Sequence, residues 1–195
     1  MVTTGSLMSG SLMSGREARA RLEQADISGG RARSALEHGL AGPPVRTSAA
    51  HLYDGERVEA LANRKVIDPW EMRARASRGF LVSRRAVSVD VAHAELLDEL
   101  SAMPRGMSPY TALSLLFADW HVDGLPFVAT VAGFVVLGAE VSGVEGGRML
   151  LRPPGAWFDG MADAQFPTGQ GRPWTLQEPR VWGKAPPRIY SRTTP

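Results

Sequence analysis

The chain has 195 residues, a formal net charge of +2 and 44% hydrophobic residues, which is enough for one large folded domain or two small ones. It contains no cysteine, which excludes a disulfide scaffold, a cysteine nucleophile and a thiolate metal site. The basic sequence pI of about 9.4 is compatible with a nucleic-acid partner without requiring one.

The N-terminal residues 1–15 contain the motif SLMSG twice and are rich in Ser, Gly and Thr. Such a segment buries little apolar surface, so we expect residues 1–15 to form a flexible tail. The segment lacks both the basic start and the continuous apolar stretch of a secretion signal. We therefore expect a cytoplasmic protein.

Two short helices are expected after this tail. The segment REARARLEQA, residues 16–25, has small or apolar residues at helical spacing, namely Ala18, Leu22 and Ala25. A turn follows, and Ser28 is a candidate N-cap for GGRARSALEHG, residues 29–39. The second helix would end at Gly39 in a left-handed conformation. It would expose Arg31 and Arg33 and pack Ala32, Ala35 and Leu36.

The stretch from Pro43 to Lys65 interrupts the helices with prolines and small residues. Its segments PVRT and AHLY can pair as a two-stranded hairpin with Arg46, Thr47 and Ser48 at the tip. Asp54 would then cap a third helix, GERVEALANRK, that returns Val58 and Leu61 to the core.

A second region is expected after a connector at residues 66–78 that contains a short, outwardly basic helix. The alternating segment FLVSRRAVSVDV favours a strand or hairpin, and AHAELLDELSAM and SPYTALSLLFADW favour amphipathic helices. The uncharged stretch Leu125–Ala139 is shorter than the roughly 20 residues that cross a bilayer, so we interpret it as buried strands and expect no membrane partner. Residues 179–195 are expected to form a flexible tail.

The first region resembles the winged helix-turn-helix of the MerR and phage-excisionase type. The likeness lies in the helix pair ARLEQADISGGRARSALEHGL, the hairpin PPVRTSAAHLYDG and the helix ERVEALANR, whose YDGERVEAL motif follows the pattern of that family. The resemblance is confined to residues 16–65. It implies a double-stranded DNA partner and no cofactor.

The resemblance also implies which residues contact DNA. The start of the second helix would enter the major groove with Arg31, Arg33 and Ser34. The hairpin would place Arg46 and Thr47 at the minor groove or the phosphates, with His51 beside them. Phosphate contacts would make the affinity dependent on salt.

Two other functions remain open. A protein-interaction adapter with the same fold is favoured if Glu23 and Glu37 neutralise the arginine-bearing face. An enzyme would have to use Asp119, His121 and Asp123, which form the motif DWHVD. Because a polar loop after a helix explains that motif better, we expect neither catalysis nor a metal site.

The resulting expectation is an α+β protein with a winged helix-turn-helix at residues 16–65 and a mixed domain of helices and antiparallel strands at residues 79–178. The Ala-, Arg- and Gly-rich composition is typical of actinobacterial proteins. Its function would be DNA binding, as a transcriptional regulator or an excisionase-like architectural factor. The second region would form a homodimer, sense a ligand or contact a protein partner.

Overall fold

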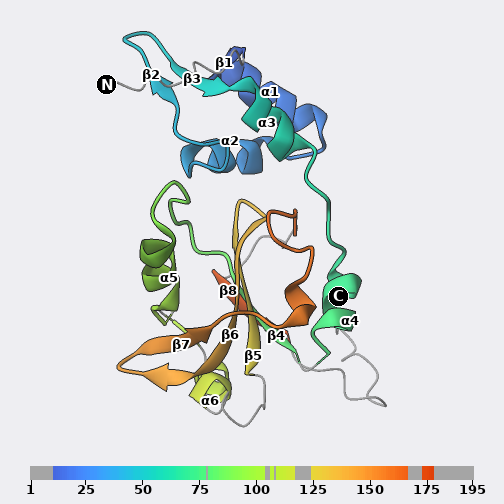
Figure 1. Ribbon diagram of the computed structural model, residues 1–195, viewed down its shortest axis with the longest axis vertical. Coiled ribbons are helices and arrows are strands. Elements are labelled where there is room, and N and C mark those ends of the chain that lie inside the picture. Colours follow the sequence, from blue (N-terminus) through green and yellow to red (C-terminus); the bar gives the residue numbers. More distant parts are fainter. Residues whose placement is uncertain are drawn as a thin grey trace, which may run out of the picture.

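The computed structural model describes residues 11–77, 79–103, 106–107, 109–116, 124–166 and 173–177. Within these ranges helices and strands are mixed, and the strands form two separate sheets. One sheet belongs to an N-terminal region and the other to a larger second region, and Figure 1 shows the first region stacked on one end of the second. The predicted mixture of helices and strands is therefore confirmed.

The N-terminal region alternates strands and helices around a small sheet. In chain order its elements are β1 (Leu12–Ser14), α1 (Gly15–Gln24), α2 (Gly29–Glu37), β2 (Val45–Arg46), β3 (His51–Asp54) and α3 (Gly55–Ala62). The sheet has the order β1-β3-β2, and both pairings are antiparallel. The three helices pack on a core that includes Leu22, Ile27 and Leu61, which are all buried.

The prediction of a flexible tail that extends to Gly15 is wrong for its last residues. Residues 12–14 form β1, which pairs with β3 and places Met13 opposite Tyr53. Ser14 then caps α1, because its hydroxyl accepts from the Glu17 backbone N–H while the Glu17 carboxylate accepts from the Ser14 N–H. Ordered structure thus begins before the first helix, through a reciprocal cap that satisfies two backbone donors.

The predicted ends of the next two helices are confirmed in part. Asp54 caps α3 by accepting from the backbone N–H groups of Glu56 and Arg57. Gly39 follows α2 with a φ of 81°, a left-handed conformation that glycine adopts at little cost. Ser28 occupies the N-cap position of α2, but its side chain makes no capping hydrogen bond.

A bidentate ion pair links α1 to α3. The Arg21 guanidinium donates from Nε and Nη2 to the two carboxylate oxygens of Glu59, at 2.5 and 2.6 Å. The hydrogen bond from Arg21 lowers the pKa of Glu59 below its ordinary value of 4.5. A depressed carboxyl pKa stabilises the fold above the unfolded-state value, and this contribution is lost as the pH falls through the folded-state value.

We therefore expect the Glu59→Gln variant to lose less stability in acid than the parent protein. The parent's free energy of unfolding should fall more steeply once the pH drops below about 4.5, because only the parent protonates a paired carboxylate there. Urea denaturation at a series of pH values measures this slope. As a control, Glu95→Gln removes an exposed carboxylate that has no ion pair among the described residues. Parallel slopes for the parent and Glu59→Gln would contradict the prediction.

The second region is built on a larger sheet. Its elements are α4 (Pro69–Arg75), β4 (Phe80–Ser83), α5 (His93–Ser101), α6 (Pro109–Leu116), β5 (Leu125–Val131), β6 (Phe134–Glu145), β7 (Arg148–Arg152), a 3₁₀ turn (Ala156–Phe158) and β8 (Trp174–Gln177). Among the described residues the strand order is β7-β6-β5-β4-β8.

The prediction that all strands of this sheet are antiparallel is wrong for one central pair. Strand β4 runs parallel to β5, with Leu81 opposite Phe127, whereas the other described pairings in this sheet are antiparallel. Parallel neighbours need a crossover connection, and the segment that carries α5 and α6 supplies it. Strand β8, which was not predicted from the sequence, pairs with β4 at the edge of the sheet.

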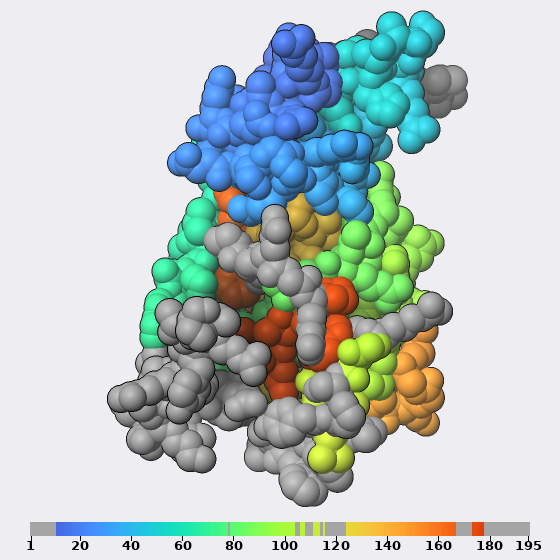
Figure 2. Space-filling model, turned by 180° about the vertical axis from the view of Figure 1, so that it is seen from behind, coloured from blue at the N-terminus to red at the C-terminus, as the bar shows by residue number. Residues whose placement is uncertain are grey.

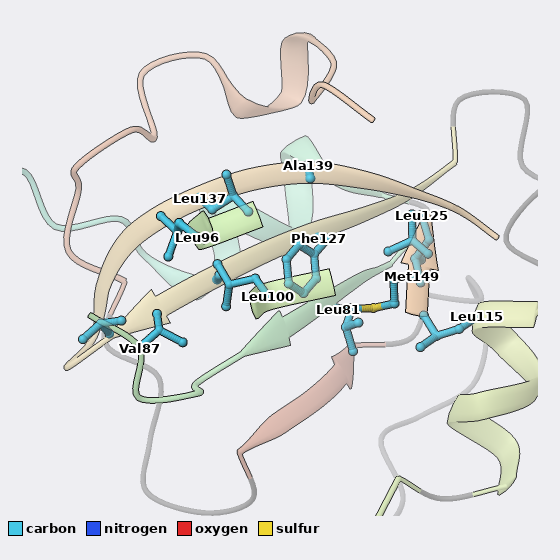
Figure 3. Packing of buried hydrophobic residues seen from close by; sticks show 13 residues of the cluster. Leu81, Val87, Leu96, Leu100, Leu115, Leu125, Phe127, Leu137, Ala139 and Met149 are labelled. Carbon is cyan, nitrogen blue, oxygen red and sulfur yellow. The ribbon is translucent and has the colours of Figure 1, made fainter. Parts of the chain in front are cut away.

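Both faces of this sheet are covered. Leu81 and Phe127 belong to a cluster with the leucines of α5 and α6, and Figure 3 shows these side chains meeting. The alternating neighbours Phe80 and Val128 belong to a second cluster with Met72 of α4. Burial on both faces explains the continuous apolar run of β5, because every residue of that strand is buried.

The predicted connector is correct in containing a short helix, α4, which Asp68 caps. It is more than a linker, however, because Ile67, Met72 and Ala76 are buried against the sheet. Phe166 is buried in the same cluster, and Trp174 is buried within β8. Among the described residues no helix is long and apolar enough to span a membrane.

Candidate nucleic-acid interface

The hairpin formed by β2 and β3 extends away from the rest of the molecule (Figure 1). Its turn is organised by Thr47, whose hydroxyl donates to the Ala50 carbonyl and accepts from the Ala50 backbone N–H. Arg46 and His51 pair across the strands next to this turn, and both side chains are exposed. The structure therefore brings together three of the predicted DNA contacts, Arg46, Thr47 and His51.

The outward face of α2 is electrically balanced. Arg33 is exposed, but its Nε lies 2.7 Å from a carboxylate oxygen of Glu37 one turn later. That carboxylate raises the pKa of Arg33. Ser34 is partly buried, and its hydroxyl lies 3.4 Å from Nδ1 of His38. Of the three predicted groove contacts on α2, Arg33 is the one whose side chain is exposed.

The expectation that Arg31 would be exposed is wrong. Its Nε donates to the carbonyl of Ala132, at 2.8 Å, in the turn between β5 and β6. A second nitrogen lies 3.4 Å from the side-chain oxygen of Gln165. Burial lowers the pKa of this guanidinium. Arg31 thus links the two regions, because its hydrogen-bond acceptors belong to the second region and direct its side chain there.

Phe134 is the centre of the contact between the two regions. It is fully buried at the start of β6, yet its neighbours include the core of the N-terminal region. The guanidinium groups of Arg31 and Arg64 lie 5.7 and 5.6 Å from the centre of its ring, within the range of cation–π attraction. We call Phe134, Arg31 and Arg64 the clasp.

The C-terminal end of α2 also lies against the second region. The backbone N–H of Val89 donates to the carbonyl of His38, and Leu40 packs against the hydrophobic clusters of both regions. Figure 2 shows the N-terminal region seated directly on the second region. One side of α2 is therefore covered from Arg31 to His38, while Gly30, Arg33 and Glu37 remain accessible.

The surface around α2 carries few uncompensated positive charges. Arg19 pairs with Glu23 at 2.8 Å, as Arg33 pairs with Glu37. Among the described residues Arg46 has no ion pair and is exposed, so its guanidinium is available to a partner.

The sequence interpretation missed the clasp residues Phe134 and Arg64. The signal for Phe134 was weak, because it lies within a continuous apolar run and looks like any other core residue. Arg64 looked like the end of an exposed helix, but Asp163 lies 3.6 Å from its Nη2, and burial lowers its pKa. The contacts of Phe134 and Arg64 cannot be predicted from local periodicity, because each joins residues that are far apart in the chain.

The motif with Asp119, His121 and Asp123 lies outside the described residues. Within the part of the chain that the structure describes, no group of three or more His, Asp or Glu side chains is arranged to hold a metal ion. No family model, curated protein or solved structure matches this chain.

Proposed function

We propose that the N-terminal region is a winged-helix DNA-binding module of the MerR and excisionase type. The observation that supports this proposal is its topology, in which β1, α1, α2, the β2–β3 hairpin and α3 follow one another and the sheet has the order β1-β3-β2. A helix pair followed by a projecting hairpin matches the helix-turn-helix and wing of that class. The protein would act as a transcriptional regulator or an architectural factor, with the second region supplying dimerisation, ligand or partner contacts.

The proposed contact surface differs from the one expected from the sequence. Arg46 would be its principal cation, with Thr47 and His51 beside it in the hairpin. On α2, the space around Gly30 is open, so a phosphate could approach the backbone closely there. Arg33 would give up its ion pair with Glu37 and bind the DNA instead. Arg31 is not part of this surface, because its donors are directed to Ala132 and Gln165.

Fluorescence anisotropy with a labelled random-sequence duplex tests this proposal. The double variant Arg33→Ala/Arg46→Ala is expected to weaken binding by at least about tenfold, because an arginine contact to DNA contributes about 1–3 kcal/mol. Binding by the parent should weaken as salt rises, with a steeper dependence than in the double variant. Arg31→Ala should bind as the parent does.

The matched control is Arg85→Ala, which removes an exposed arginine of the second region that pairs with Glu99. It should retain the parent affinity. Absence of binding at low salt, or a double variant with unchanged affinity, would contradict DNA binding. If binding is found, selection of genomic fragments would identify the target sequence.

A protein-interaction adapter is the second candidate. It is favoured by the pairing of Arg33 with Glu37 and Arg19 with Glu23, which neutralises the outward face of the helices. It is also favoured by the contact between α2 and the second region, which covers one side of the helix that would enter the groove. This candidate predicts that the parent protein binds no duplex at low salt.

A further inference from the structure

The second region contains a pocket of about 610 Å³ that is lined by residues of neither the clasp nor the hairpin. It lies between the end of α4, the neighbouring strands β5 and β6, and the segment after β7. Its lining includes Arg75, Pro126, Glu140, Arg152, Pro153 and Trp157. This volume falls within the range of small-molecule sites, which is about 300–1,000 Å³.

Glu140 is the unusual group in this pocket. Its side chain points from the middle of β6, and the residue is only 6% exposed. One carboxylate oxygen, Oε1, accepts hydrogen bonds from the Trp157 indole N–H at 2.9 Å and the Gly155 backbone N–H at 3.2 Å. The other, Oε2, has no hydrogen-bond or ion-pair partner among the described residues. Buried polar atoms normally have hydrogen-bond partners, and among the described residues only Oε1 of this carboxylate has them.

A structural role accounts for the hydrogen bonds of Oε1 but not for the negative charge or for Oε2. Oε1 holds the segment that follows β7 by satisfying two donors of Gly155 and Trp157. A glutamine carbonyl would accept the same two hydrogen bonds without placing a charge in the sheet. The charge and the unoccupied Oε2 are therefore the features that a ligand would use.

Arg152 supplies the complementary charge without neutralising Glu140. The two residues are directly opposite each other in the pairing of β6 with β7, yet they form no ion pair. Arg152 is exposed and has no ion-pair partner among the described residues. Arg75, the other cation of the pocket, already pairs with Glu71 and donates to the Asp159 carbonyl.

We propose that this pocket binds a small zwitterionic amino compound, such as an amino acid. The protonated amino group would donate to Oε2 of Glu140, and the anionic group would bind the Arg152 guanidinium. Trp157 offers an aromatic ring beside the carboxylate, an arrangement that favours ammonium groups. Pro126 and Pro153 supply apolar walls for the remainder of the ligand. This binding site does not depend on whether the N-terminal region binds DNA.

Titration calorimetry of the full chain with the common L-amino acids and with phosphoethanolamine tests the proposal. At least one of these compounds should bind, and comparing the two arms tells whether the anion is a carboxylate or a phosphate. Glu140→Gln keeps the acceptor for Trp157 and Gly155 but removes the charge, so it should weaken that binding at least about tenfold, equivalent to about 1.4 kcal/mol. The N-acetylated form of the bound compound lacks the ammonium group, so the parent protein should bind it at least as weakly as Glu140→Gln binds the unmodified compound.

Arg152→Ala provides a second variant that keeps Glu140 and alters an exposed side chain, so it remains informative if Glu140→Gln does not fold. It too should weaken binding about tenfold or more. Arg85→Ala is the control with the same loss of charge in the same region, and it should bind as the parent does. The proposal is overturned if no compound of the panel binds, or if the folded variants at Glu140 and Arg152 bind as tightly as the parent.

Discussion

Phe134→Ala is expected to lower the free energy of unfolding by about 3–5 kcal/mol, the usual cost of removing a buried phenylalanine ring. The ring is fully buried, and the guanidinium groups of Arg31 and Arg64 lie 5.7 and 5.6 Å from its centre. Its loss would leave a cavity at the contact between the two regions and would remove the surface on which both cations rest. The N-terminal region should therefore open more readily than the sheet beneath it.

Hydrogen exchange of the backbone amides measures this local opening. In Phe134→Ala the amides of α1, α2 and α3 should exchange faster relative to the parent than those of β4 and β5. Phe158→Ala is the matched control, because it removes the same ring from a half-buried position that packs against the cluster of Met72 and not against the core of the N-terminal region. It should leave the exchange of the three helices unchanged. Equal acceleration in both regions would contradict the role of the clasp.

Phe127→Ala is expected to have a comparable effect of about 3–5 kcal/mol, but in the second region. Phe127 is fully buried in β5, opposite Leu81 of the parallel neighbour β4, and it contacts the leucine cluster beneath α5 and α6 (Figure 3). All five tryptophans of the chain come after residue 65, so tryptophan fluorescence reports on this region. The urea midpoint of Phe127→Ala, followed by tryptophan fluorescence, should therefore be well below that of the parent.

The control for Phe127→Ala is Leu150→Ala, which shortens a side chain that is 44% exposed on β7. Its urea midpoint should stay close to that of the parent, because little apolar surface leaves the interior. A shift as large as that of Phe127→Ala would show that the stability of the sheet is not concentrated in the cluster around Phe127.

The positions of α1, α2 and α3 could be predicted because their determinants are local. Ala18 and Leu22 recur at the helical period, Asp54 provides a side-chain cap, and Gly39 provides the left-handed residue at the helix end. The hairpin and its exposed Arg46 follow from the same kind of short-range signal. These features hold whichever way the two regions contact each other.

The parallel pairing of β4 with β5 could not be predicted in this way. Many residues separate Ser83 from Leu125, and the choice of neighbour depends on which faces α4, α5 and α6 cover. Trp174 in β8 illustrates the same difficulty, since its Pro- and Gly-rich surroundings gave no strand signal although the strand completes the sheet. Strand partners are selected by contacts that form only when the chain is compact.

The sequence by itself determined the helical elements of the N-terminal region, the projecting hairpin and the buried character of β5, because periodicity and capping act between near neighbours. Only the tertiary structure decided that Arg31 faces Ala132 instead of solvent, that Phe134 joins two cores, and that Glu140 is buried beside an unpaired Arg152. The physical reason is that the burial and charge partners of a side chain depend on residues brought together from distant parts of the chain. The candidate site for a zwitterionic ligand is therefore a property of the assembled fold, and so is the exclusion of Arg31 from the candidate DNA surface.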